Sequence, residues 1–161
     1  MDAAWVIGLY NKFLANGIQT YVDGGWCVDA LLGRETRPHA DLDIAVERKD
    51  AARLHALLAE WGYTKEQRRD STEWNYAMKD GHHAVDVHVF EYDDQGTSVY
   101  GIEYPFGSLR GEGTINGQKV KCISPEWIFK FKTSYLPQEK DRQDVHHLAA
   151  AYGFAIPETH R

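Results

Sequence analysis

The chain has 161 residues, 43% of them hydrophobic, which is typical of one globular domain and argues against a disordered or low-complexity protein. Its net charge of −6 argues against a basic nucleic-acid-binding surface but is compatible with a metal site or a cationic small molecule. No apolar run is long enough to cross a membrane and no signal peptide is evident, so we expect a cytoplasmic protein without a nucleic acid or membrane partner.

The first half of the sequence alternates helical and extended patterns. Asn16-Gly17 indicates the end of a first helix, and Asp23-Gly24-Gly25-Trp26 indicates a tight turn. In chain order we expect a helix over 3–16, a strand over 18–22, a helix over 26–32, a loop over 34–40, a strand over 42–46 and a helix over 49–61. In the strand over 42–46 we expect the even-numbered side chains to point inward.

The second half contains more strand than helix. Asp80-Gly81 and Asn116-Gly117 are turn signals that divide the extended patterns into two hairpins, and Ser124-Pro125-Glu126 is a helix-start signal. We expect strands over 73–78, 84–90, 112–115 and 118–123, then one helix from 124 and another over about 138–152. This order predicts a single α+β (mixed α/β) domain over 1–161, with a central mixed sheet flanked by helices. Its core spans about 1–123, and two C-terminal helices span about 124–155.

Asp41 and Asp43 are the first candidate metal ligands. They lie two positions apart at the start of a predicted strand, where side chains at i and i+2 point to the same face. Two adjacent carboxylates repel each other unless a cation lies between them, and Mg²⁺ prefers such hard oxygen ligands. An isolated Asp-X-Asp pair is also common by chance, as a turn acid and a strand-edge acid with no joint role. The pair alone therefore leaves both interpretations open.

Two other features strengthen the metal hypothesis. Gly24-Gly25 lies between a predicted strand and a helix, where glycine lets the backbone approach a phosphate beside a positively polarised helix N-terminus. Asp86 lies in the middle of a predicted strand and shares one face with His88 and Phe90. A buried carboxylate is costly without a partner, which a metal ion or a substrate hydroxyl would supply. A solvated face is the alternative, which His88 permits and Phe90 argues against.

The spaced combination resembles the nucleotidyltransferase superfamily related to DNA polymerase β. The shared features are a Gly-Gly turn that opens a helix, Asp-X-Asp on the next strand and a third Asp on a later strand. Residues 21–29 and 37–43 resemble the small antibiotic nucleotidyltransferases, namely the lincosamide nucleotidyltransferases and the aminoglycoside 2''-nucleotidyltransferases. Residues 85–88, 120–124 and 139–145 resemble the lincosamide branch. The resemblance covers most of the chain and implies the nucleotidyltransferase fold.

The resemblance also implies a reaction and its cofactors. It implies Mg²⁺-dependent transfer of a nucleoside monophosphate, with ATP as the expected nucleoside triphosphate, to a hydroxyl of a small molecule, with release of pyrophosphate. Asp41 and Asp43 would hold the metal, for which two ions are expected, and Asp86 would share one metal ion or act as the catalytic base. Gly25 stands where many superfamily members have Ser, so we expect phosphate binding to depend on backbone N–H groups and cations.

Charged residues near this set are further candidates. The expected nucleotide-binding residues are Gly24, Gly25, Arg37, His39 and Lys140. Arg37 and His39 are equally consistent with a surface role, and Lys140 is the weaker candidate. Asp141 and Asp144 face one side of the last predicted helix. They would either contact the substrate and support the metal site, or stabilise the start of the helix through its dipole.

Aromatic residues are candidates for the acceptor site, although aromatic side chains lie more often in a core. Those considered are Trp74, Tyr76, Tyr100, Tyr104 and Trp127. Tyr100 and Tyr104 are the better candidates because they lie in an irregular stretch before Pro105. We expect the long stretch over 92–110 to have little regular structure and to cover the acceptor site.

Three functions remain open from the sequence. The leading hypothesis is an enzyme that adenylylates a lincosamide or an aminoglycoside antibiotic, where the short chain favours the former and the acidic charge favours the latter. The second is the same chemistry on a non-antibiotic metabolite. The third is a non-catalytic nucleotide-binding or antitoxin-like protein, against which the complete set of Asp41, Asp43 and Asp86 argues. The resemblance is compatible with a homodimer, and the sequence does not identify the modified hydroxyl.

Overall fold

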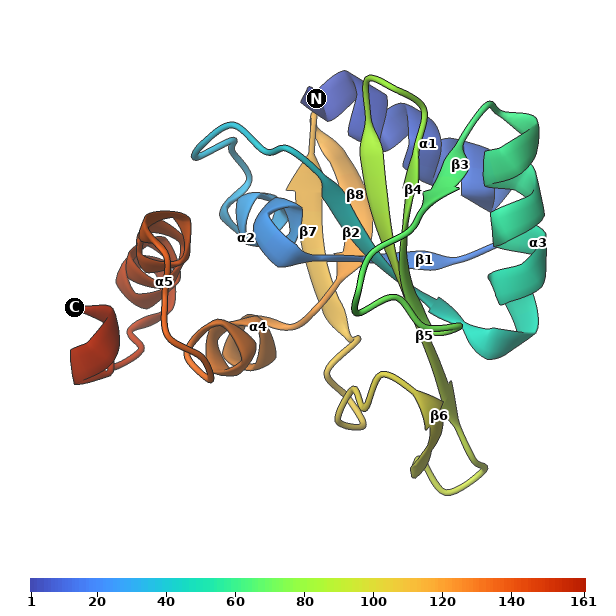
Figure 1. Cartoon of the computed structure of the whole chain (residues 1–161). Coiled ribbons are helices and arrows are strands. Elements are labelled where there is room, and N and C mark those ends of the chain that lie inside the picture. The colour runs from blue at the N-terminus through green and yellow to red at the C-terminus, as the bar shows by residue number, and fades with distance from the viewer.

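The computed structural model describes all 161 residues and contains an eight-stranded sheet with helices around it (Figure 1). The helices are α1 (Ala3–Ala15), α2 (Gly24–Leu32), α3 (Arg48–Glu60), α4 (Pro125–Lys132) and α5 (Glu139–Tyr152), followed by a short 3₁₀ helix, η1 (Glu158–His160). The strands are β1 (Thr20–Asp23), β2 (Leu42–Glu47), β3 (Thr64–Glu66), β4 (Asn75–Lys79), β5 (Ala84–Tyr92), β6 (Ser98–Gly101), β7 (Gly111–Ile115) and β8 (Gln118–Cys122). This architecture confirms the predicted fold class.

The strands that carry the predicted site lie side by side in the middle of the sheet. The strand order is β3-β4-β5-β2-β1-β8-β7, and β6 pairs with β5. β2 runs parallel to β5 and antiparallel to β1, so the sheet is mixed. The register places Asp23 opposite Asp43, and Asp43 opposite Asp86. Because paired residues project from the same face, three carboxylates form one row across three neighbouring strands.

The opposite face of these central strands is apolar. Leu42, Ile44 and Val46 are buried, as the predicted inward positions require. Phe13 from α1 and Leu54 from α3 belong to the same hydrophobic core. Helix α2 contacts both α4 and α5, and Figure 1 shows these three helices on the side of the molecule away from α3. No helix combines the length and apolar character needed to span a lipid bilayer.

Several boundaries differ from the expectations. The helix expected over 26–32 begins at Gly24, because the Asp23 carboxylate accepts the Gly24 N–H and caps the helix there. The strand expected over 73–78 is shifted along the chain to β4. The expectation of little regular structure over 92–110 was wrong in part, because β6 forms there by pairing with β5. Strand β3 was not predicted because its three largely exposed residues give no hydrophobic alternation.

Candidate active site

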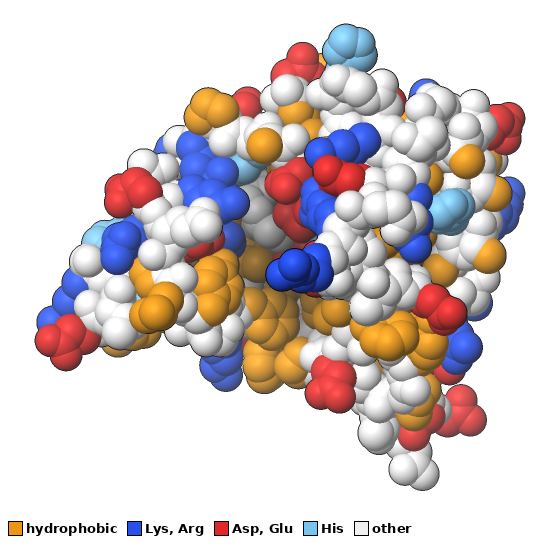
Figure 2. Space-filling view, in the orientation of Figure 1, with side chains coloured by type: hydrophobic (Ala, Val, Ile, Leu, Met, Phe, Trp, Pro, Cys, Tyr) orange, Lys and Arg blue, Asp and Glu red, His pale blue; other side chains and the backbone are white.

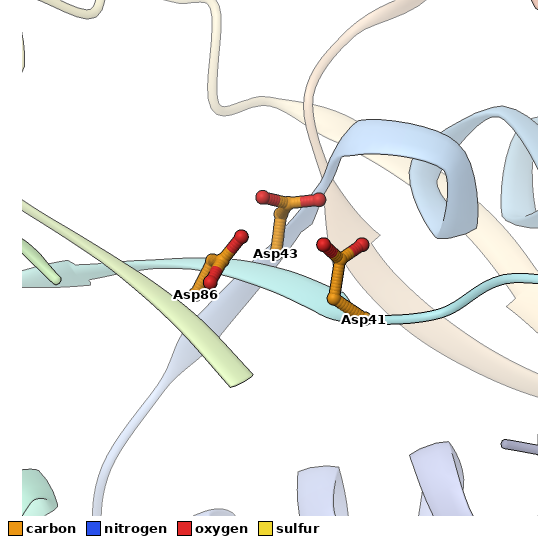
Figure 3. A group of neighbouring side chains, drawn as sticks. All are labelled: Asp41, Asp43 and Asp86. Atoms are coloured by element: carbon orange, nitrogen blue, oxygen red, sulfur yellow. The ribbon is translucent and has the colours of Figure 1, made fainter. Parts of the chain in front are cut away.

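Three carboxylates project in the same direction from the centre of the sheet (Figure 3). Asp43 lies on β2, Asp86 lies on β5, and Asp41 lies directly before β2. One carboxylate oxygen from each residue lies within 4.8 Å of an oxygen from each of the other two. The structure therefore brings together the three residues that the sequence indicated as metal ligands.

Their closeness changes the acidity of these carboxylates. Burial, followed by the negative charges of Asp43 and Asp41, raises the pKa of Asp86 to about 6. Burial and the charge of Asp43 also raise the pKa of Asp41. Raised pKa values mean that the cluster takes up a compensating positive charge more readily than separate carboxylates do. A compact cluster of hard oxygen donors fits Mg²⁺.

Two side chains from outside the cluster contact it. Arg68, in the segment after β3, places Nη1 at 3.2 Å from Oδ1 of Asp86. His88, two residues further along β5, places Nε2 at 3.2 Å from Oδ1 of Asp43. Although burial opposes it, the hydrogen bond to Asp43 and the neighbouring carboxylates raise the pKa of His88. Arg68 places compensating positive charge beside the carboxylates, and His88 does so when its ring is protonated.

The carboxylates line a polar cleft of about 600 Å³. Figure 2 shows acidic side chains in this hollow, with Lys and Arg side chains on both sides of it. The cleft is also lined by every residue expected to bind the nucleotide: Gly24, Gly25, Arg37, His39 and Lys140. Their convergence on one cleft is observed, whereas their contacts with a nucleotide remain a prediction.

Gly24 and Gly25 leave room for other side chains of the cleft. Gly24 has a φ of +61°, which favours glycine, and a β-carbon there would collide with the carboxylate of Asp43. A β-carbon on Gly25 would lie 2.5 Å from both Nη2 of Arg37 and Nδ1 of His39. A serine at this position would displace two side chains of the cleft, which gives a physical reason for glycine here.

A buried carboxylate fixes Arg37. Nε and Nη2 of Arg37 donate to the two carboxylate oxygens of Asp144, at 2.9 and 2.8 Å. Asp144 is fully buried and also pairs with Lys132, whose Nζ lies 2.9 Å from Oδ2. Burial opposes ionisation of Asp144, but the two cations lower its pKa below the ordinary value. Asp144 therefore supports two cationic side chains that line the cleft.

Asp141 stabilises the start of α5 and also lines the polar cleft, so both interpretations of this residue remain open. Its Oδ2 accepts the backbone N–H of Gln138 at 2.9 Å and completes a capping box. Its Oδ1 accepts the hydroxyl of Tyr135 at 3.0 Å. Because Tyr135 lines the polar cleft, the cap of α5 also fixes an aromatic side chain at the site.

A second and more apolar cleft, of about 410 Å³, adjoins the first. The residues that line only this second cleft are Asn75, His88, Ile102, Glu103, Tyr104, Ile128 and Phe131. Four residues line both clefts: Asp23, Gly24, Lys132 and Tyr135. The molecule thus contains a polar compartment and a more apolar compartment that meet at a shared boundary.

The predicted aromatic wall is present only in part. Tyr104 lines the second cleft and donates its hydroxyl to Oδ2 of Asp23 at 2.7 Å. Tyr76 instead is buried on β4 and lies in the hydrophobic core. Tyr100 packs against the guanidinium of Arg48, 3.8 Å from its ring centre, and lines neither cleft. Of the two better candidates, only Tyr104 lies at the site.

Sequence reasoning missed several residues that line the two clefts or contact the carboxylate cluster. Asp23 could have been found, because it precedes the Gly-Gly turn at the end of a strand that pairs with β2. No local signal marks Arg68, Lys132 or Tyr135, because their positions depend on how distant segments pack. Their positions near the clefts follow from the three-dimensional structure alone.

The sequence model of one known family, described as aminoglycoside-2''-adenylyltransferase, matches residues 6–148. The chain belongs to this family. A family member from Escherichia coli, a 2''-aminoglycoside nucleotidyltransferase, is 30% identical over 134 residues, which cover 80% of this chain and 72% of that protein. A lincosamide resistance protein from Staphylococcus haemolyticus is 28% identical over 137 residues, which cover 80% of this chain and 82% of that protein. This aminoglycoside-2''-adenylyltransferase family member is therefore a nucleotidyltransferase of the antibiotic-modifying type.

Solved structures show the same fold. The lincosamide antibiotic adenylyltransferase LnuA, crystallised with lincomycin, superimposes with a TM-score of 0.77 at 23% identity and covers 90% of this chain and 94% of its own. ANT(2'')-Ia in complex with adenylyl-2''-tobramycin superimposes with a TM-score of 0.78 at 22% identity, and the match covers 92% of this chain and 88% of that chain. Both likenesses confirm the predicted nucleotidyltransferase fold for this aminoglycoside-2''-adenylyltransferase family member.

Proposed function

We propose that this nucleotidyltransferase moves AMP from ATP to a hydroxyl of a lincosamide antibiotic and releases pyrophosphate. The observation that supports the proposal most directly is the meeting of two unlike clefts at Asp23, Gly24, Lys132 and Tyr135. The polar cleft suits a charged triphosphate, and the more apolar cleft suits an organic ring system. Transfer between two bound substrates requires such adjoining sites, because the reacting atoms must be held close together.

Asp41, Asp43 and Asp86 would hold the metal, for which we expect two Mg²⁺ ions. When bound, Mg²⁺ supplies positive charge that stabilises the phosphoryl group in transfer and the pyrophosphate that leaves. The mutual distances within 4.8 Å and the raised pKa values of Asp41 and Asp86 support this assignment. In the absence of the metal, Arg68 compensates part of the negative charge, as does His88 when it is protonated.

The proposed reaction forms one bond and breaks one bond. The acceptor hydroxyl oxygen attacks the α-phosphorus of ATP, and the bond from that phosphorus to the oxygen bridging to the β-phosphate breaks. The hydroxyl proton would pass to the carboxylate of Asp86, which lies beside Asp41 and Asp43 in the cluster. Arg37 and Lys140 would contact the phosphates and His39 would contact the nucleotide, because all three line the polar cleft.

The lining of the second cleft favours a lincosamide over an aminoglycoside. Ile102, Ile128 and Phe131 present apolar surface, and Asp23 and Glu103 are the carboxylates that line this cleft. A polycationic aminoglycoside loses more hydration on entering such a cleft than a lincosamide, which carries one amine. The aminoglycoside remains the second candidate, since the chain has a net charge of −6 and 2''-aminoglycoside nucleotidyltransferases are among its relatives.

The test is pyrophosphate release from labelled nucleoside triphosphates in the presence of Mg²⁺ and a panel of lincosamides and aminoglycosides. Turnover of ATP with a lincosamide is expected. Turnover with aminoglycosides only would reassign the acceptor. Tight nucleotide binding without turnover on any antibiotic would favour a non-antibiotic metabolite, and failure to bind nucleotide with Mg²⁺ would favour a non-catalytic protein.

A matched pair of variants tests the metal assignment. Asp43→Asn should abolish turnover and leave the melting temperature unchanged or higher, because it removes repulsion within the cluster. Asp94→Asn removes an exposed carboxylate from a turn outside both clefts and should leave turnover unchanged. Near-normal turnover by Asp43→Asn would contradict the assignment.

A further inference from the structure

Asp29 and His39 form a buried pair beside the polar cleft, and the proposed reaction does not use Asp29. Asp29 lies on α2, and His39 lies in the loop before Asp41. Each side chain is only 2% exposed, and Nε2 of His39 lies 2.5 Å from Oδ2 of Asp29. A buried carboxylate needs such partners, so this contact strongly constrains both side chains.

Asp29 is itself fixed by a second set of hydrogen bonds. Its Oδ1 accepts the backbone N–H of Thr36 at 3.2 Å and the Thr36 hydroxyl at 2.6 Å. Rotation of the carboxylate would break these bonds as well as the bond to His39. Asp29 therefore connects the rigid helix α2 to the loop that contains both Thr36 and His39.

The hydrogen bond to Asp29 determines which edge of the His39 ring faces the cleft. With Nε2 bound to Asp29, the opposite edge faces Gly25, where a β-carbon would lie 2.5 Å from Nδ1 and 2.7 Å from Cε1. Trp26 packs on the ring, with ring centres 4.7 Å apart, and limits its tilt. Nδ1 makes no hydrogen bond within the protein, and both His39 and Gly25 line the polar cleft.

We propose that Asp29 is a positioning residue for the nucleotide, acting through His39. It holds the ring so that the unprotonated Nδ1 faces the nucleotide bound against the backbone of Gly25 and accepts a hydrogen bond from one of its hydroxyl or amino groups. This inference rests on the proposed function, since it needs a triphosphate in the polar cleft. A ring fixed before binding loses less conformational freedom on binding than a free ring, so the carboxylate increases affinity without contacting the ligand.

Asp29→Asn tests the proposal with little change in size. The amide can still accept from Thr36, but its N–H group would donate to Nε2 and move the ring proton to Nδ1. Long-range ¹H–¹⁵N spectra of the histidine rings should show a proton on Nε2 of His39 in the wild type and its loss in the variant. The Kd of the Mg²⁺ complex of the α,β-methylene analogue of ATP should rise about tenfold, which is about 1.4 kcal/mol.

A double-mutant cycle separates positioning from a general loss of structure. His39→Gln alone should weaken nucleotide binding about as much as Asp29→Asn, and the double variant should be little weaker than either. If Asp29 had only a structural role, Asp29→Asn would weaken binding by the same factor whether or not His39 is also substituted. The melting temperature would then fall in parallel with the loss of binding. Independent, multiplying effects would therefore overturn the proposal.

Asp80 and His83 supply a matched control outside both clefts. Oδ2 of Asp80 lies 3.2 Å from Nδ1 of His83, so Asp80→Asn disrupts a similar pair and should leave the nucleotide Kd unchanged. A normal wild-type Kd together with an unchanged Kd for Asp29→Asn would overturn this inference and leave the proposed function intact. Failure of the wild type to bind the analogue would overturn both, and normal binding without antibiotic turnover would overturn only the proposed function.

Discussion

The guanidinium of Arg37 lies so close to the α-carbon of Gly25 that a β-carbon there would approach Nη2 to 2.5 Å. Arg37 cannot move away at low energetic cost, because its guanidinium donates to both carboxylate oxygens of the buried Asp144. The absence of a side chain at Gly25 is therefore a condition for the arrangement of the cleft. Substitution at this glycine should act on nucleotide binding through Arg37 and His39.

Gly25→Ala is expected to weaken Mg²⁺–ATP binding at least tenfold, measured by isothermal titration calorimetry. The added methyl group must push Arg37 and His39 out of their positions, whereas helix propensity alone would favour alanine by about 1 kcal/mol. Gly8→Ala is the matched control, because Gly8 lies in α1 and a β-carbon added there would have no neighbour within 4 Å. Equal, unchanged affinities for the two variants would show that the cleft tolerates a side chain at Gly25.

Asp144→Asn should destabilise the protein by about 3 kcal/mol in urea denaturation at pH 7, because it leaves buried positive charge without its partner. The pKa of Asp144 is lower in the folded state than the ordinary 3.8. Its stabilising contribution is therefore complete above pH 3.8 and is lost as the pH falls through the folded-state value. The stability difference between wild type and variant should shrink below pH 3.8, and a constant difference would contradict the ion-pair explanation.

The metal-free protein should lose stability as the pH rises from about 4 to 7, in part because of Asp86. Its folded-state pKa of about 6 lies above the ordinary 3.8, so protonated Asp86 favours the folded state and that contribution is lost as the pH rises through 6. Asp86→Asn should remove this part of the pH dependence and stabilise the metal-free protein by about 1 kcal/mol at pH 7, after allowance for solvent screening and Arg68.

Addition of Mg²⁺ should make the wild type more stable than Asp86→Asn, which reverses the order of stability of the metal-free proteins. It should raise the melting temperature of the wild type at pH 7 more than that of Asp86→Asn, because the variant lacks one of three carboxylates in the cluster. Differential scanning fluorimetry with and without Mg²⁺ measures both effects. Equal shifts in the two proteins would exclude Asp86 from the metal site.

Local patterns predicted the features that depend on neighbouring residues. The Asp41–Asp43 spacing, the strand that carries Asp86 and the cap signals of α4 can each be read within a few positions. The need for glycine at position 25 could not be predicted from neighbouring residues, because Arg37 and His39 reach Gly25 only after their loop folds back onto α2. The three-dimensional packing likewise determines that Asp23 lies on the boundary of both clefts, which no spacing in the sequence indicates.

The hydroxyl of Tyr104 lies at that boundary, and its removal should affect the acceptor more than the nucleotide. It donates to Oδ2 of Asp23, whose Oδ1 accepts the Gly24 N–H at 2.7 Å. Tyr104 itself lines only the second cleft. Tyr104→Phe leaves the ring but removes the hydrogen bond to Oδ2 of Asp23, so the acceptor KM should rise about fivefold, equivalent to about 1 kcal/mol for one lost hydrogen bond.

The nucleotide Kd of Tyr104→Phe should change less than about twofold, because Asp23 retains its bond to Gly24. Tyr10→Phe is the control, since Tyr10 is also buried and its hydroxyl accepts hydrogen bonds from Lys121 and Gln19 outside both clefts. It should leave the KM for the acceptor unchanged. A larger effect of Tyr104→Phe on the nucleotide than on the acceptor would contradict the assignment of the second cleft to the acceptor, because Tyr104 lines that cleft and not the polar cleft.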